Sequence, residues 1–484
     1  MFSPSQTLRL PDAVPWKLSP RLNLIVNVLG VLLLVSAPFW FFELFGIYEE
    51  HMPISIFISA STVALIVSFD YVLILHCSRR HPSLRRLMTV GFLAKLAATG
   101  LYITMVVRVY DYAADMAHYF YAAEGLTTTY FQTGILTVPE PLWGSNFPAF
   151  LEQCLFVVTG ISMPVAMVVF ASMSFWGAYF LYRAFCIGFP EASRFDLMAS
   201  VAFLLPSCVF WTASISKDAI VMMGAGIATY GFARMHQRVG LAGYALLGAG
   251  LTVIMTVRPH TAGILAIAFL FPHLFAANRT GLSGLALKVV GIPVLVALCA
   301  LLVSRAETYV EMSDFSGGKA AVMQVARNNA DMGGSSYGRS LAARLALAPF
   351  LLIRPFPFEV HNFQAALASL EGLGLLFLCV RRRKVVYRNL ARIRSNPFAM
   401  FLALYAIEFT VIYAAAITNF GLLVRQRVML LPFALMLFLG DSRFESYETS
   451  RPARVLKLRR RSPIVVSGTV RVRRPTEGLD EVRL

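Results

Sequence analysis

The residues of this chain that could carry chemistry lie in short polar clusters between long apolar stretches. The first cluster holds Asp111, Asp115 and Tyr119. Asp115 and Tyr119 are four residues apart, so they share a face if the segment is helical. A carboxylate beside a water-filled cleft can act as a general base. The cluster therefore offers a candidate base, with a solvated loop acid as the competing interpretation.

Two further clusters supply cations in tight turns. Lys217 follows Ser214-Ile-Ser, and Arg258 and His260 form an Arg-Pro-His turn. An ammonium can bind a phosphate as a compact point charge. Charges at the edge of an apolar span are costly unless they have a partner or face water. We therefore take these residues as candidate anion ligands, while a surface pair of Lys217 with Asp218 remains the alternative.

The fourth cluster brings Arg425 and Arg427 to the start of the last apolar stretch. A guanidinium presents a planar fork that holds phosphate oxygens through two parallel hydrogen bonds. The competing interpretation is that both side chains snorkel to the membrane surface. Together the four clusters predict a site that holds a phosphate and activates an acceptor hydroxyl.

Other kinds of site have no recognisable pattern in the sequence. We find no Walker A motif, no dinucleotide fingerprint, no zinc-ligand spacing and no defensible Ser-His-Asp arrangement. The six cysteines are scattered without a CxxC pair, which is typical of small buried side chains. We therefore predict neither a metal ion nor a cofactor.

The elements that must position these clusters are membrane helices. Of the 484 residues, 57% are hydrophobic and only 14% are charged, whereas soluble proteins carry roughly 25% charged residues. A helix that spans a bilayer needs roughly 20 apolar residues. The sequence predicts an all-α polytopic membrane protein with about twelve transmembrane helices, near residues 23–46, 54–77, 87–107, 162–184, 196–213, 219–234, 240–257, 261–277, 288–304, 362–380, 398–417 and 428–440.

The basic residues fix the expected orientation. Most of the 43 lysines and arginines fall in alternate connections if both termini are cytoplasmic, as the positive-inside rule requires. The net charge of +17 is then explained by topology, so we predict no nucleic-acid partner. All four polar clusters lie on the outer side in this arrangement.

The predicted organisation has three parts. Residues 1–22 form a cytoplasmic N-terminal segment, 23–440 the transmembrane domain and 441–484 a basic cytoplasmic tail. Two long outer loops cover 108–147 and 305–361, and the second contains an apolar stretch at 345–358 that is too short to span a bilayer. Contact of the tail with anionic lipid is one interpretation, and a solvated tail is the other.

Three of these segments also resemble a known family. The runs PSCVFWTASISKDAI, RPHTAG and NFGLLVRQRVMLLP are similar to segments of bacterial GT-C-like glycosyltransferases or O-antigen-polymerase-like membrane proteins. The resemblance covers roughly residues 105–435. It implies Asp115 as catalytic base with Tyr119 beside it, and Asp111 as the alternative base.

The same resemblance implies which residues bind the donor. Lys217, Arg258, His260, Arg425 and Arg427 would hold a polyprenyl-phosphate-linked sugar. The chain departs from the family pattern, because two predicted spans precede the acidic loop and its acids are separated.

The expected function is therefore glycosyl transfer, or polysaccharide polymerisation, onto an extracytoplasmic glycan or lipid acceptor at the bacterial inner membrane. The alternatives are a transporter or flippase of an anionic lipid-linked substrate and a non-catalytic partner of envelope-assembly proteins. A transporter would place its charges near the middle of the bilayer. In this chain only Asp70 and Lys95 are expected to lie deep within spans.

Overall fold

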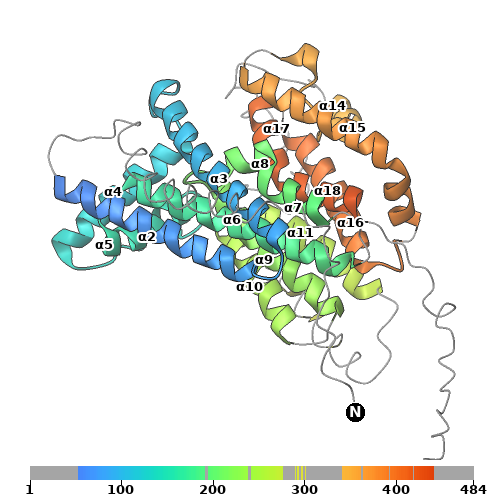
Figure 1. Ribbon diagram of the computed structural model, residues 1–484, viewed down its shortest axis with the longest axis horizontal. Coiled ribbons are helices and arrows are strands. Elements are labelled where there is room, and N and C mark those ends of the chain that lie inside the picture. The colour runs from blue at the N-terminus through green and yellow to red at the C-terminus, as the bar shows by residue number, and fades with distance from the viewer. Residues whose placement is uncertain are drawn as a thin grey trace, which may run out of the picture. The chain divides into compact units, whose positions relative to one another are not determined.

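The computed structural model describes residues 53–190, 195–237, 241–275, 341–360, 363–391, 393–417 and 419–440, with a few residues between 289 and 300. Within these ranges every regular element is a helix (Figure 1). The predicted span at 23–46, most of that at 288–304, both terminal segments and residues 305–340 of the second outer loop lie outside the described residues.

The helices follow one another with short connections. The long helices are α2 (Pro53–Cys77), α3 (Pro82–Arg108), α6 (Met163–Gly188), α9 (Lys217–Gln237), α15 (Phe363–Ala391) and α16 (Pro397–Ala416). The shorter ones are α4 (Asp115–Thr133), α5 (Asn146–Thr159), α7 (Phe195–Leu204), α8 (Pro206–Trp211), α10 (Leu241–Val257), α11 (Pro259–Phe275), α14 (Leu341–Leu347), α17 (Phe420–Gln426) and α18 (Leu431–Leu439). Three 3-10 turns complete the described elements, namely η2 (Ala348–Phe350), η3 (Pro357–Glu359) and η4 (Arg427–Met429).

The length and apolarity of these helices identify a membrane protein. Among the described residues, 5 helices are long and apolar enough to cross a bilayer, or up to 6 if the bent pair at 420–439 is one span. They include α2, α3, α6, α15 and α16, close to five of the predicted spans. The chain is therefore a helical membrane protein.

The segments at 196–213 and 428–440 were each predicted to be one continuous helix. The structure shows a break in each of them. The predicted span at 196–213 ends as α7 at Leu204 and restarts as α8 at Pro206, with Leu205 in an extended conformation (φ −64°, ψ 117°). A proline disfavours the helical conformation of the residue before it and offers no N–H to continue the helix. The helix pair at 420–439 bends by 54° between Met429 and Leu431, and Pro432 lies in the first turn of α18.

The predicted loop at 108–147 contains a helix, α4, and a second helix, α5, begins at its end. α4 buries Met116, Tyr119, Phe120, Ala123 and Thr127. These positions recur at the three- and four-residue spacing of an amphipathic helix. α5 covers the short apolar lead-in before α6 and packs against α4. The second loop, where described, contains only α14, η2 and η3.

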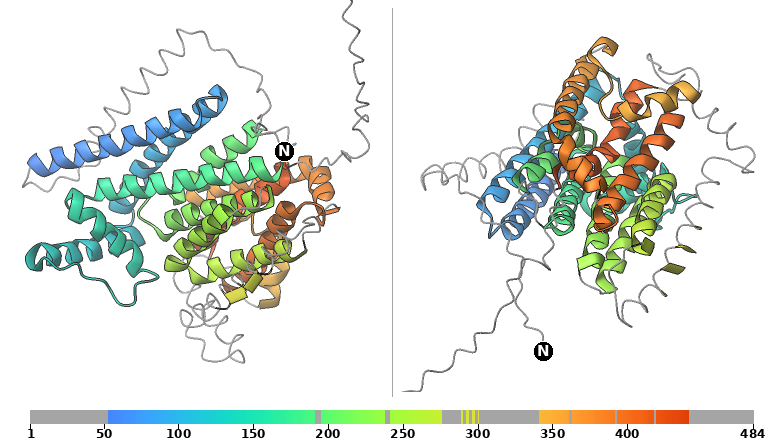
Figure 2. Two further views of the ribbon diagram at one scale, coloured as in Figure 1. Left: turned by 90° about the horizontal axis from the view of Figure 1, so that it is seen from below. Right: turned by 90° about the vertical axis from the view of Figure 1, so that its right-hand side faces the viewer.

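Helices α6, α9 and α10 pack side by side through glycines (Figure 2). A Cβ on Gly226 of α9 would lie 2.2 Å from the carbonyl oxygen of Gly177 on α6. A Cβ on Gly250 of α10 would lie 2.4 Å from the carbonyl oxygen of Gly224. Small residues let membrane helices approach this closely. The contacts fix how α9 and α10, which carry site residues at their ends, lie against α6.

A buried ion pair ties the last helices to α15 and α8. Arg427 is 0% exposed, and its guanidinium donates to the Glu371 carboxylate at 2.6 Å and to the carbonyl of Ala368 at 3.1 Å. Nη1 of Arg427 donates to the Arg354 carbonyl at 2.8 Å. The Glu371 carboxylate also accepts from the Ser207 amide at 3.0 Å. Arg427 therefore connects four segments that are distant in the sequence.

Replacing Arg427 by methionine should destabilise the protein, because it leaves Glu371 buried without its cation. Loss of one partner of a buried pair costs about 3–5 kcal/mol. The double variant R427M/E371Q removes the uncompensated charge, so it should recover part of the lost thermal stability in detergent. Arg381→Met, at an exposed position of α15, is the control. Equal melting temperatures for the single and double variants would contradict the assignment.

Glu152 of α5 predicts a pH dependence of stability. It is 0% exposed, and neither carboxyl oxygen has a hydrogen-bond partner among the described residues. Burial raises its pKa well above the ordinary value, so the folded protein binds this proton more tightly than the unfolded chain. Stability should therefore fall as pH rises from the ordinary glutamate range through the raised pKa.

The measurement is the melting temperature of the protein in detergent between pH 5 and pH 9. Glu152→Gln should give a flatter profile than the native protein, since an amide of the same shape does not ionise. Glu140→Gln, at an exposed position, should leave the profile unchanged. Parallel profiles for the native protein and Glu152→Gln would exclude this role for Glu152.

Candidate functional site

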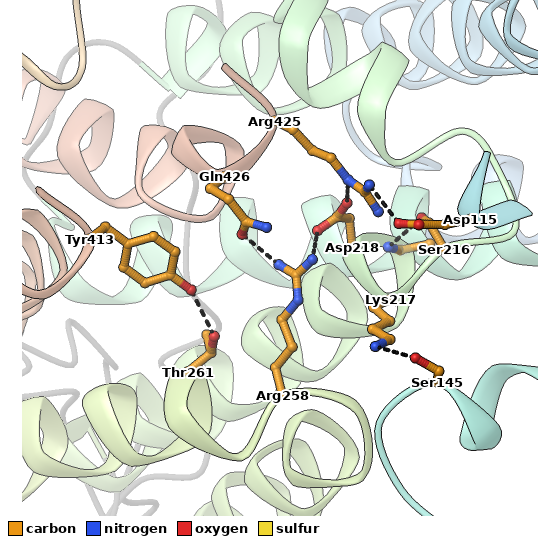
Figure 3. Close-up of polar contacts among 11 residues, drawn as sticks. Asp115, Ser145, Ser216, Lys217, Asp218, Arg258, Thr261, Tyr413, Arg425 and Gln426 are labelled. Atoms are coloured by element: carbon orange, nitrogen blue, oxygen red, sulfur yellow. Dashed lines mark hydrogen bonds and ion pairs between the residues drawn. The ribbon is translucent and has the colours of Figure 1, made fainter. Parts of the chain in front are cut away.

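A buried carboxylate lies at the centre of the candidate site. Asp218, in the first turn of α9, is 0% exposed and pairs with Arg258 at 2.7 Å and Arg425 at 2.6 Å (Figure 3). Burial alone would raise its pKa, but the two guanidinium groups hold the pKa below the ordinary value. The carboxylate is therefore ionised and fixes both arginines in place.

Each arginine makes a second contact beyond Asp218. Arg258, which lies just before α11, donates to the Gln426 side-chain oxygen at 2.7 Å. Arg425, on α17, uses Nη1 to bind the Asp115 carboxylate at 2.7 Å. A continuous polar chain thus joins Gln426, Arg258, Asp218, Arg425 and Asp115. It connects α4, α9, α11 and α17 at one place.

Lys217 is the third cation of this cluster. Its ammonium donates to the Ser145 hydroxyl at 2.9 Å and lies 6.0 Å from the centre of the Tyr119 ring. It makes no ion pair within the described residues. Burial and then repulsion by Arg258 lower its pKa to about 8. Lys217 is therefore a cation in need of an anionic partner.

Four helices begin at this cluster. α9 begins at Lys217, α11 at Pro259, α4 at Asp115 and α5 directly after Ser145. The first turn of a helix leaves backbone N–H groups without intrahelical partners and carries a partial positive charge. Such ends favour anions. The backbone therefore adds to the positive potential of the three side chains.

The two carboxylates of the cluster differ in exposure. The side chain of Asp218 is 0% exposed, whereas that of Asp115 is 51% exposed. Solvent-exposed ion pairs contribute only about 0–1 kcal/mol, while a buried charge left without its partner costs about 3–5 kcal/mol. The Asp218 contacts are thus structural, and the Asp115 contact is open to exchange.

Tyr119 and His260 border the cluster. Tyr119 is 3% exposed, and burial raises its pKa, so its phenol stays neutral beneath Lys217. His260 follows Arg258 by two residues, and its ring centroid lies 6.4 Å from that of Tyr413. Tyr413 and Thr261 share a hydrogen bond of 3.1 Å. These groups extend the polar lining from α11 to α16.

The structure brings together most of the residues that the sequence singled out. Asp115, Tyr119, Lys217, Arg258 and Arg425 meet in one cluster, with His260 at its edge (Figure 3).

Two predicted residues lie apart from the cluster. Asp111 is exposed, has a φ of 45° and makes no ion pair with any described residue. Arg427 is buried against Glu371, and its Nη1 and Nη2 donate to protein groups away from the cluster.

Sequence reasoning missed three contributors. A surface pair of Lys217 with Asp218 was the alternative interpretation of this turn, and that alternative is wrong because Asp218 is fully buried between two arginines. Gln426 and Ser145 were not singled out. Gln426 is next to Arg425 at the end of α17, and Ser145 directly precedes α5. An acid in a turn between two apolar spans was the signal available for Asp218.

Comparison of the chain with known proteins gives no assignment. No family model, curated protein or solved structure matches it.

Proposed function

We propose that this protein is a membrane glycosyltransferase or polysaccharide polymerase with a GT-C-like arrangement of about twelve spans. It transfers a sugar or oligosaccharide from a polyprenyl-phosphate-linked donor to an extracytoplasmic glycan or lipid acceptor. It resides in a bacterial inner membrane with both termini in the cytoplasm. The observation that supports the proposal is the meeting of Lys217, Arg258 and Arg425 with the half-exposed Asp115 at four helix N-termini.

The cluster provides two groups that this reaction needs. Lys217 and the outer face of Arg425 bind the donor phosphate, where negative charge develops as the sugar leaves. Asp115 takes the proton of the acceptor hydroxyl. The acceptor oxygen forms a bond to the anomeric carbon while the bond from that carbon to the phosphate oxygen breaks. The electron pair leaves with the phosphate and the proton remains on Asp115.

Asp218 has a different part in this mechanism. It is fully buried, so it does not reach substrate. By pairing with Arg258 and Arg425 it keeps both guanidinium groups charged, oriented and close to each other. Asp218 is therefore a positioning residue.

A transporter is the second candidate, and the surroundings of Asp70 and Lys95, the two charges expected to lie deep within spans, do not favour it. Asp70 is held by Ser172 at 2.5 Å and Trp176 at 2.7 Å. The Lys95 ammonium donates to Thr212 at 2.6 Å and to the carbonyls of Cys208 and Val209 at 3.1 Å. Both groups are buried and satisfied by neighbouring helices. Neither forms an ion pair with the cluster around Asp218 among the described residues.

Asp115→Asn should abolish polysaccharide formation, because an amide cannot accept the proton. Loss of a general base typically costs about 10²–10⁴-fold in rate. The measurement is extracellular polysaccharide in cells whose only copy of the gene carries the variant, normalised to the protein level in the membrane. Asp111→Asn is the matched control, since Asp111 is exposed and lies outside the cluster. Equal polysaccharide from both variants would refute the role of Asp115.

Binding of a phosphate ligand should weaken as Lys217 loses its proton. The pKa of Lys217 is lowered to about 8, so the ammonium is mostly charged at pH 7 and mostly neutral at pH 9. The affinity of purified protein for farnesyl phosphate should therefore fall between these values.

Lys217→Arg supplies the control for this pH dependence, since a guanidinium stays protonated over the whole range. Its affinity should be almost independent of pH from 7 to 9. If the affinity of the native protein for farnesyl phosphate were equally independent of pH, Lys217 would be ruled out as the phosphate ligand.

A further inference from the structure

We infer that a phosphate bound at Arg425 displaces Asp115 and so releases the base of the site only when the donor is in place. This inference rests on the proposed function and adds a regulatory step to it. In the structure Asp115 is paired with Arg425, so its Oδ2 accepts a hydrogen bond from the guanidinium and is not available to the hydroxyl of an acceptor. Binding of the donor and activation of the base would then be one event.

The two carboxylates bound by Arg425 differ in exposure, and this difference determines which of them a phosphate can displace. Its Nε binds the fully buried Asp218, and its Nη1 binds Asp115, whose side chain is 51% exposed. Nη2 makes no hydrogen bond with the described residues. An arriving phosphate can accept from Nη2 and Nη1 as a bidentate pair. It competes with the carboxylate that water already reaches, and Asp218 keeps the guanidinium in place.

Lys217 also makes a hydrogen bond that a phosphate could replace. Its hydrogen-bond partner is the neutral hydroxyl of Ser145, a residue on the exposed surface. A phosphate oxygen binds an ammonium more strongly than a hydroxyl does, because both partners carry charge. Asp115 begins α4 and Ser145 precedes α5, so a bound phosphate replaces contacts made by these two helix starts. The hydrogen bond from the Gly144 amide to the Thr256 carbonyl, at 2.8 Å, does not involve Lys217 and would remain.

The link before α4 is suited to a local movement of Asp115. Asp111 and Tyr112 have φ values of 45° and 61°. Residues with a Cβ adopt this left-handed region only at a cost in free energy. Release of Asp115 from Arg425 removes a contact that holds this strained link. The carboxylate can then turn toward the acceptor without movement of α9 or α11.

Such a switch would make donor binding precede activation of the acceptor. With Arg425 bound to Asp115 the base is not available, so a hydroxyl or water that arrives first is not activated. Once a phosphate occupies Arg425, the carboxylate is free and the sugar is already in position. Ordered binding follows from competition for one guanidinium and needs no large domain motion.

Carbodiimide labelling of carboxylates, read by mass spectrometry, tests this exchange. Full-length protein in detergent is labelled with and without farnesyl phosphate, and separately with inorganic phosphate. Asp115 should label several-fold more with the ligand, while the exposed Glu140, which lies outside the link before α4, serves as the internal reference and stays constant. A response to farnesyl phosphate at much lower concentration than to inorganic phosphate identifies a lipid-linked ligand, and equal responses identify a free phosphate.

Acylation of Lys217, measured on the same samples, reports whether the ligand is bound. Protection of Lys217 with no rise, or with a fall, in Asp115 labelling overturns the switch but leaves the phosphate site intact. Absence of Lys217 protection by either probe overturns both the switch and the proposed donor site. Arg425→Ala should label Asp115 strongly with or without ligand. If that variant does not fold, the comparison within the native protein decides alone.

Discussion

The structure of the site depends on one buried carboxylate shared by two arginines. Asp218 pairs with both Arg258 and Arg425 where no water reaches it. Without this charge, two guanidinium groups from helices distant in the sequence would repel each other and face the cost of partial burial. With it, α11 and α17 are both anchored to the first turn of α9. The same pairing leaves Arg425 with donors still free to bind an anion.

The packing of the helices makes this convergence possible. The close glycine contacts of α6, α9 and α10 bring the chain back to the end where α9 begins. α10 ends at Val257, so Arg258 and the start of α11 lie beside Asp218. The bend after η4 turns the chain between α17 and α18. The cluster is thus built from helix ends, where side chains and unpaired backbone N–H groups act on the same ligand.

The sequence predicted the helices better than their interruptions. Apolar length located α2, α3, α6 and α16 closely, because burial in lipid requires a minimum span. It overlooked the break at Leu205, although Pro206 was a local signal for it. It also overlooked α4, whose buried side chains follow a helical period within a polar stretch. Burial of Asp218 depends on partners more than 30 residues away, so local reasoning could not exclude a surface position for it.

The contrast between Arg425 and Arg427 shows why residue type alone does not locate a ligand site. The two arginines are two residues apart and looked equivalent in the sequence. The chain changes from α17 to η4 between them, so Arg425 turns toward Asp218 and water reaches part of it. Arg427 turns toward Glu371 and is fully buried among carbonyl groups. An arginine can bind a ligand only where a ligand can reach its donors, and Arg427 is 0% exposed whereas the side chain of Arg425 is 17% exposed. That condition separates the two residues, and it follows from the path of the backbone.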